Sequence, residues 1–181
     1  MSDSPATTFV VFTENETGLL QRVVSVFTRR HVNIDSLTTS RSSTEGIHRF
    51  TIVARVDERM REHLRAQLNK QVDVLRAFAY EPHELVQQEI ALYKVPAAAF
   101  ADGDRVERLV RAHNARILAI EPAYVVIERT GHHHETEQLL ADLREVGVYE
   151  FVRSGTIAVV KPMEQLNTYL QALAAASGSA S

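Results

Sequence analysis

The stretch FVVFTENETGLLQRVVSVFTRRHVNIDSL, residues 9–37, changes its hydrophobic period twice, and these changes decide the fold of the first half. Phe9–Thr13 is a short β-rich run, whereas the apolar residues from Gly18 to Arg30 recur at helical spacing. Residues 33–43 are rich in Thr, Ile and Ser, which favours a second strand. The stretch therefore predicts strand, helix and strand, and the predicted core face of the helix comprises Leu19, Leu20, Val23, Val24 and Phe27.

The next residues complete a repeating unit. A turn at Glu45-Gly46 leads into an alternating strand, residues 48–56, so residues 33–56 are predicted to form a hairpin. Met60, Leu64 and Leu68 then mark a helix, and residues 72–80 a fourth strand. The predicted order is βαββαβ.

The same order recurs after residues 81–84, an acidic stretch that contains Pro82 and is predicted to be a linker. Pro162 suits the first turn of a final helix, and the tail AAASGSAS is predicted to be disordered. The expected elements are a strand at 89–95, a helix at 104–114, strands at 116–121 and 124–129, a helix at 135–146, strands at 148–152 and 156–160, and a final helix with Met163, Leu166, Leu170 and Leu173 on one face.

Two βαββαβ halves predict an α+β fold of two ferredoxin-like domains, each a four-stranded antiparallel sheet with both helices on one face. The predicted domains span residues 8–80 and 86–174, the second including the terminal helix. Each sheet is expected to have one bare face and at least one open edge. Because such small domains are marginally stable alone, we expect a homodimer or a higher homo-oligomer.

Composition excludes several classes of function. The formal net charge of -3 and the alternation of arginines with acids argue against a nucleic-acid partner. The chain has no cysteine, which excludes disulfides, thiol nucleophiles and thiolate metal sites. MSDSPATT does not have the pattern of a signal peptide, and no apolar run reaches the roughly 18 residues of a membrane span. We therefore expect a cytoplasmic protein with no membrane partner.

Three residues around the first predicted helix suggest either a helix cap or a small-molecule site. A helix N-terminus presents unpaired N–H groups that suit a carboxylate, and Gly18 lets a ligand approach the backbone. Asn15 offers both a donor and an acceptor. Asn33 lies beyond the other end of the same helix, roughly 20 Å away at 1.5 Å per residue. One small ligand could therefore reach both asparagines only if two chains contribute.

Several motifs in this chain resemble those of the ACT-domain regulatory (small) subunit of acetolactate synthase, also called acetohydroxyacid synthase. The family pattern E-N-x-x-G-x-L-x-R-V, F-x-x-R and N-I-E-S-L is matched by residues 14–23, 27–30 and 33–37. Further matches are Q-L-N-K at 67–70, V-D-V-L at 72–75, E-I-A-L-Y-K-V at 89–95 and R-S-G at 153–155. The resemblance covers roughly residues 8–160.

The resemblance implies a non-catalytic subunit that activates a large catalytic subunit and transmits feedback inhibition by branched-chain amino acids, usually valine. Thiamine diphosphate, Mg²⁺ and FAD are expected in that partner, and no cofactor in this chain. The residues carried over as effector-binding are Asn15 and Gly18 from one ACT domain and Asn33 from another. His31, where the family commonly has glycine, and Asp35, where it has glutamate, lie beside Asn33 and could alter effector choice.

A second hypothesis is a stand-alone ligand- or metal-responsive regulator with the same fold. Its motivation is His132-His133-His134, although adjacent residues cannot easily aim at one ion and the His-Glu-x-x-His spacing is absent. No nucleophile-elbow, P-loop or dinucleotide-binding motif occurs, so the sequence predicts no catalytic and no metal residues.

Overall fold

The structure is a computed structural model that describes residues 4–101, 104–161, 171 and 175. It divides into two compact units, which we describe separately: residues 4–86 together with residues 158–161, and residues 87–157. The final helix predicted from Pro162 and the tail predicted to be disordered fall, apart from Gln171 and Ala175, outside the described residues.

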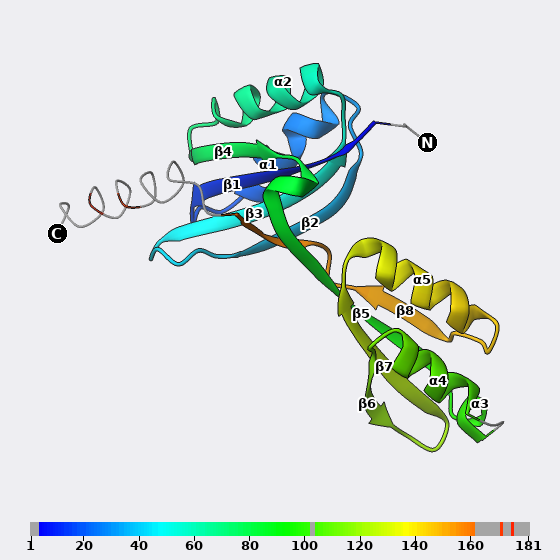
Figure 1. Ribbon diagram of the computed structural model, residues 1–181. Coiled ribbons are helices and arrows are strands. Elements are labelled where there is room, and N and C mark those ends of the chain that lie inside the picture. Colours follow the sequence, from blue (N-terminus) through cyan, green and yellow to red (C-terminus); the bar gives the residue numbers. More distant parts are fainter. Residues whose placement is uncertain (1–3, 102–103, 162–170, 172–174, 176–181) are drawn as a thin grey trace. The chain divides into compact units, whose positions relative to one another are not determined.

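The first unit has the predicted βαββαβ order (Figure 1). Its four strands form one antiparallel sheet in the order β2-β3-β1-β4, so β1 lies between β3 and β4. The elements are β1 (Ala6–Glu14), α1 (Leu19–Thr28), β2 (Ile34–Arg41), β3 (Ile47–Arg55), α2 (Glu58–Leu68), β4 (Val74–Tyr80) and the short 3₁₀ helix η1 (Pro82–Glu84), which occupies the predicted linker.

The second unit repeats this arrangement, with strand order β6-β7-β5-β8 and with β9 paired to β5. The prediction of an α+β fold with two ferredoxin-like domains is confirmed, but the second sheet has five strands rather than the predicted four, because β9 also pairs with β5. The elements are β5 (Leu85–Pro96), α3 (Ala98–Ala101), α4 (Arg105–Ala112), β6 (Arg116–Ile120), β7 (Tyr124–Gly131), α5 (His133–Arg144), β8 (Glu150–Arg153) and β9 (Ile157–Val160).

Each sheet packs its helices against one face. In the first unit, α1 and α2 cover Phe9, Val11, Phe50 and Ile52. The buried face of α1 differs from the predicted one, because Val26 is in the core whereas Leu20 is 46% exposed. In the second unit, the buried residues Val106, Val110, Leu139 and Leu143 of α4 and α5 pack against Ala91, Tyr93, Val95, Val125 and Ile127.

The other face of the first sheet is not bare, which corrects the expectation from the sequence. Val10, Phe12, Ile47 and Tyr80 form a second apolar cluster with Leu85 of β5 and Ala158 of β9. Arg49 lies at the edge of this cluster, where its guanidinium stands 5.9 Å from the ring centroid of Phe12 and donates from Nη2 to the carbonyl oxygen of Ala158 (2.5 Å). Burial lowers the pKa of Arg49 from its ordinary value.

These contacts join residues 158–161 to the first unit. The sequence predicted domains of residues 8–80 and 86–174, which placed residues 158–161 in the second. In the structure, residues 158–161 belong with the first unit. The backbone N–H of Lys161 donates to the carbonyl oxygen of Glu84 (3.0 Å), and Ala158 lies in the second cluster. A long-range packing contact therefore overrides the linear order.

Helix α1 ends in a Schellman motif. The N–H of Val32 donates to the carbonyl oxygen of Phe27 (3.1 Å), and the N–H of His31 to that of Thr28 (3.0 Å). This motif requires a left-handed residue between helix and strand, and His31 supplies it with φ = 54°. His31 thus adopts a left-handed conformation that its Cβ makes unfavourable, at a position where the family commonly has glycine.

We predict that His31→Gly raises the free energy of unfolding by about 0.5 to 1 kcal/mol, because glycine relieves the left-handed strain and loses part of the gain as unfolded-state entropy. Asn114, which has φ = 49° at the end of α4, is the matched control. Asparagine tolerates this conformation, so Asn114→Gly should change stability by only a few tenths of a kcal/mol. Urea denaturation followed by circular dichroism measures both. A destabilised His31→Gly would contradict the prediction.

Candidate functional site

The predicted site residues lie on the exposed rim of the first unit. Asn15 follows β1, Gly18 immediately precedes α1, and Asn33 immediately precedes β2. All three are exposed, and the side chains of Asn15 and Asn33 make no hydrogen bond within the described part of the chain. Polar groups in this state are available to a ligand.

The start of α1 is open. Gly18 is left-handed (φ = 82°), and a Cβ built there meets no atom within 4 Å. No side chain caps this helix. The N–H groups of Leu20 and Gln21 donate to no acceptor among the described residues. By contrast, Asp57 caps α2 by accepting from the N–H of Met60 (2.7 Å).

The sequence suggested a helix cap as one of two roles for Asn15, but its side chain makes no capping hydrogen bond within the described residues. An uncapped helix start with two free N–H groups and partial positive charge is a geometry that suits a carboxylate. The arrangement can therefore hold an anion by its backbone, with the Asn15 amide nearby.

Asn33 is not brought together with Asn15 and Gly18 in one chain. The ten residues of α1 separate them, and that helix is about 15 Å long at 1.5 Å per residue. Asn33 instead adjoins β2, which is an edge strand of its sheet. Asp35 of β2 is exposed and forms an ion pair with Arg55 (3.3 Å), so it faces β3 rather than the start of α1.

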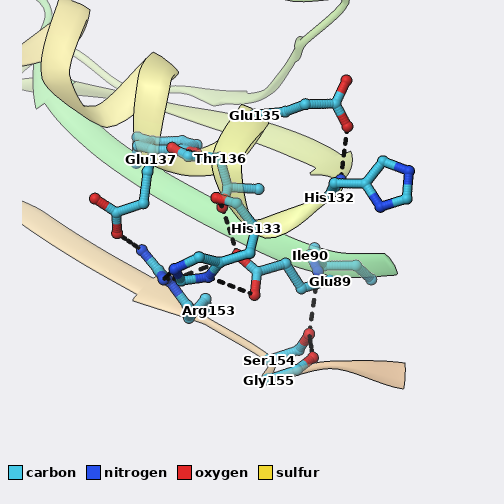
Figure 2. Close-up of polar contacts among 11 residues, drawn as sticks. Glu89, Ile90, His132, His133, Glu135, Thr136, Glu137, Arg153, Ser154 and Gly155 are labelled. Carbon is cyan, nitrogen blue, oxygen red and sulfur yellow. Dashed lines mark hydrogen bonds and ion pairs between the residues drawn. The ribbon is translucent and has the colours of Figure 1, made fainter. Parts of the chain in front are cut away.

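A second polar constellation, in the other unit, was not predicted. The carboxylate of Glu89 is 2% exposed and accepts a hydrogen bond from the hydroxyl of Thr136. Arg153 Nε lies 3.7 Å from one carboxylate oxygen, and His133 Nδ1 lies 3.3 Å from the other. Figure 2 shows these side chains converging from β5, α5 and β8. We call these four residues the Glu89 cluster.

The R-S-G motif anchors β8 beside this cluster. Ser154 donates its backbone N–H to the carbonyl oxygen of Ile90 (2.9 Å), and its hydroxyl oxygen accepts from the N–H of Ile90 (3.0 Å). Gly155 then turns the chain with φ = 79°, which favours glycine. Arg153 is thereby held in place, where it also contacts Glu137 (Figure 2). The motif is explained by structure rather than by ligand chemistry.

The three adjacent histidines do not converge on one point. His133 turns toward Glu89 and Arg153 (Figure 2). The ring of His132 instead stacks on that of His134, with centroids 5.7 Å apart. The N–H of His132 donates to Glu135 (2.6 Å) and completes a capping box at the start of α5. Within the described ranges, no group of three or more histidines and acids could hold a metal ion.

One sequence signal could have revealed the Glu89 cluster. Along β5, Glu89 falls on the same side as Ala91, Tyr93 and Val95, all of which are buried. An acid in register with a buried apolar face requires a partner. Nothing local identifies that partner, because Thr136 and Arg153 lie far along the chain.

Charge and burial shift pKa values around this cluster. The hydrogen bond from Arg153 lowers the pKa of Glu137 below its ordinary value of 4.5. Burial raises the pKa of Tyr93, whose hydroxyl donates to the carbonyl oxygen of Thr136 (2.7 Å). Glu137 is therefore charged and Tyr93 is neutral near pH 7, as a structural role requires.

We predict that Arg153→Met lowers the free energy of unfolding by about 3 kcal/mol, because it leaves the buried Glu89 carboxylate without its cation. Glu137→Gln is the matched control, since it removes only a half-exposed ion pair with the same arginine and should cost less than about 1 kcal/mol. Denaturant titrations at pH 7 compare the two. Equal losses would show that Glu89 does not depend on Arg153.

The same pair predicts a pH effect. Because the folded pKa of Glu137 is lowered, its contribution is fully present above the unfolded value of 4.5 and is lost as pH falls through the folded value. Glu137→Gln should therefore show a weaker loss of stability between neutral and acid pH than the unmodified protein does.

None of the helices in the described part of the chain combines the length and the hydropathy that a membrane span needs.

Both halves of the chain match models of known protein families. The family model described as "AHAS small subunit-like ACT domain" matches residues 9–76, and the model described as "Small subunit of acetolactate synthase" matches residues 88–162. The "Acetolactate synthase small subunit" of Bacillus subtilis is 34% identical over 83% of this chain and 88% of its own. The "Acetolactate synthase isozyme 3 small subunit" of Escherichia coli is 33% identical over 82% and 91%.

A solved structure agrees with these relatives. The crystal structure of the acetolactate synthase small subunit from Thermotoga maritima superposes with a TM-score of 0.79 at 27% sequence identity. The match covers 87% of this chain and 98% of that one. This match and the two family models together cover both βαββαβ units. This chain belongs to the acetolactate synthase small-subunit family.

Proposed function

We propose that this chain is the regulatory subunit of an acetolactate synthase. It activates a large catalytic subunit and confers feedback inhibition by a branched-chain amino acid, with valine as the first candidate. Its matches to small subunits over most of the chain carry the proposal. The catalytic chemistry, with thiamine diphosphate, Mg²⁺ and FAD, belongs to the partner, and this chain contributes no catalytic residue and no cofactor.

The proposed effector site consists of Asn15 and Gly18 from one copy and Asn33 from a second. The open start of α1 supports it, because the free N–H groups of Leu20 and Gln21 suit the effector carboxylate. The amide oxygen of an asparagine can accept from the effector ammonium group. Asn33 can join only across an interface, since α1 separates it from Gly18 within one chain.

The interface that fits this site is the open β2 edge. Asn33 directly precedes β2, and in the part of the chain that the structure describes β2 pairs on one side only, with β3. Two copies related by a two-fold axis there would each bring Asn33 toward the other copy's α1. Effector binding would then depend on the dimer.

The alternative is a stand-alone metal-responsive regulator, for which the histidines were the motivation. His133 is engaged with the Glu89 cluster, and His132 caps α5 through its backbone. The observation that would favour this alternative is saturable binding of Ni²⁺ or Zn²⁺ with no effect on acetolactate formation.

We predict that the cognate large subunit forms acetolactate faster when this chain is added, with saturation at a fixed stoichiometry, whereas this chain alone forms none. The reason is that the family supplies a partner and the sequence contains no catalytic motif. A titration of large subunit with this chain measures it. A rate that stays flat across the titration would remove the regulatory-subunit proposal.

We predict that Gly18→Asp resists valine. A new carboxylate about 4 Å from the effector carboxylate costs roughly 1 to 4 kcal/mol for an effective dielectric between 80 and 20. The effector affinity should fall by several-fold to about a thousandfold at 1.4 kcal/mol per factor of ten. The helix should survive, because an acid at its N-terminus is favourable and the space around Gly18 is open.

Gly18→Asn is the matched control, since both residues carry the same left-handed strain and only Asp adds charge. Asn33→Ala should weaken inhibition from the other side of the interface. All three variants should still activate the large subunit, which separates loss of effector binding from loss of the subunit. Valine inhibition curves that coincide for Gly18→Asp and Gly18→Asn would exclude an anion at the start of α1.

A further inference from the structure

Strand β6 is an apolar open edge. It lies at the end of the second sheet, and β7 is its only neighbour among the described strands (Figure 1). Ile117 is 39% exposed, Leu118 53% and Ile120 71%. The strand interior contains no proline and no lysine, which are the residues that usually protect an edge from pairing. Such an edge offers free backbone groups and aliphatic side chains to another strand.

A β-bulge gives β6 an unusual symmetry. Arg116 and Ile117 pair with Glu128 and Ile127, but Ala119 and Ile120 pair with Val126 and Val125, so Leu118 is an extra residue. Ile127 and Val125 are in the core under the helices, and therefore Ile117 and Ile120 share that face. In a regular strand, Ile117 and Ile120 would lie on opposite faces, because side chains alternate and these residues are three apart. The bulge at Leu118 places them on the same face.

The ends of the strand continue this pattern. Arg116 lies opposite Glu128, on the face away from the helices, and forms an ion pair with it through Nε. Glu121 donates its N–H to the carbonyl oxygen of Tyr124, so it continues the pairing with β7, and its side chain alternates with that of Ile120. Arg116 and Glu121 therefore share the face away from the helices. The order in which side chains alternate between the two faces from Arg116 to Glu121 is therefore the same in both chain directions.

We propose that β6 pairs antiparallel with β6 of a second copy of this chain, about a two-fold axis between Leu118 and Ala119. In this register Arg116 faces the partner's Glu121, and Ile117 faces the partner's Ile120. Each residue then meets one on the same sheet face, as an antiparallel pair requires. The two sheets join into one.

The side chains favour this occupant over an unrelated strand. Opposite charges meet at both ends, and aliphatic residues meet between them, and both kinds of cross-strand pair stabilise a sheet. The Nη groups of Arg116 make no hydrogen bond within the described residues and can reach Glu121 while Nε holds Glu128. A two-fold interface requires this kind of self-complementarity.

The absence of cysteine in the chain allows a direct test. Residues directly opposite in an antiparallel pair have Cβ atoms about 4.5 to 5.5 Å apart, close to disulfide geometry. A mixture of full-length Ile117→Cys and Ile120→Cys should give a covalent dimer under mild oxidation. Either variant alone should not, because its two thiols are three residues out of register, roughly 10 Å at 3.3 Å per residue.

Two controls complete the experiment. Val72→Cys, another exposed apolar position, mixed with Ile120→Cys reports random oxidation and should not cross-link. Adding Glu121→Arg to both partners places two arginines opposite each other and should lower the cross-linked yield several-fold. Circular dichroism of each single variant verifies folding. No cross-link in the mixture, or equal cross-linking by either variant alone, would overturn the proposed pairing.

Discussion

Burial of β1 on both faces is the constraint on which the first unit depends. Phe9 and Val11 lie under α1 and α2, whereas Val10 and Phe12 lie in the second cluster with Leu85 and Ala158. A strand that is apolar on both sides must be central and must be covered twice. β1 accordingly pairs with β3 and β4. Its end at Glu14 fixes where the turn with Asn15 begins, and hence where α1 starts.

The order of elements was accessible from the sequence because it is encoded locally. Helical spacing in α1 and alternation in β3 occur within single segments, and the turns at Gly18 and Gly46 are marked by glycine. The second cluster was not accessible in the same way. The continuous apolar run of β1 predicts burial on both faces. Nothing in that run shows that β9 packs against the second face. The Glu89 cluster could not be predicted for the same reason. Its buried acid can be recognised within β5, whereas its partner Arg153 lies far along the chain.

The candidate site likewise has features that the sequence predicts and features that only the structure shows. Asn15, Gly18 and Asn33 could be identified by motif, and the left-handed backbone at Gly18 follows from residue type. The absence of a cap on α1 could not, because Asn15, Glu16 and Thr17 are all residues that could have provided one. Only the structure distinguishes an unsatisfied helix start from a satisfied one. That distinction supports the proposed anion site at this turn.

The two units show how one topology can serve two kinds of contact. β2 and β6 occupy the same place in sheets of the same order, yet β2 exposes Asp35, Thr39, Ser40 and Arg41 while β6 exposes aliphatic side chains. A polar edge strand pairs through backbone hydrogen bonds and hydroxyl groups, and this kind of contact is compatible with a hydrated ligand at the end of the strand. An apolar edge gains from excluding water along its length. The proposed effector site and the proposed pairing of two copies would use one edge of each kind, and the two edges belong to separate sheets.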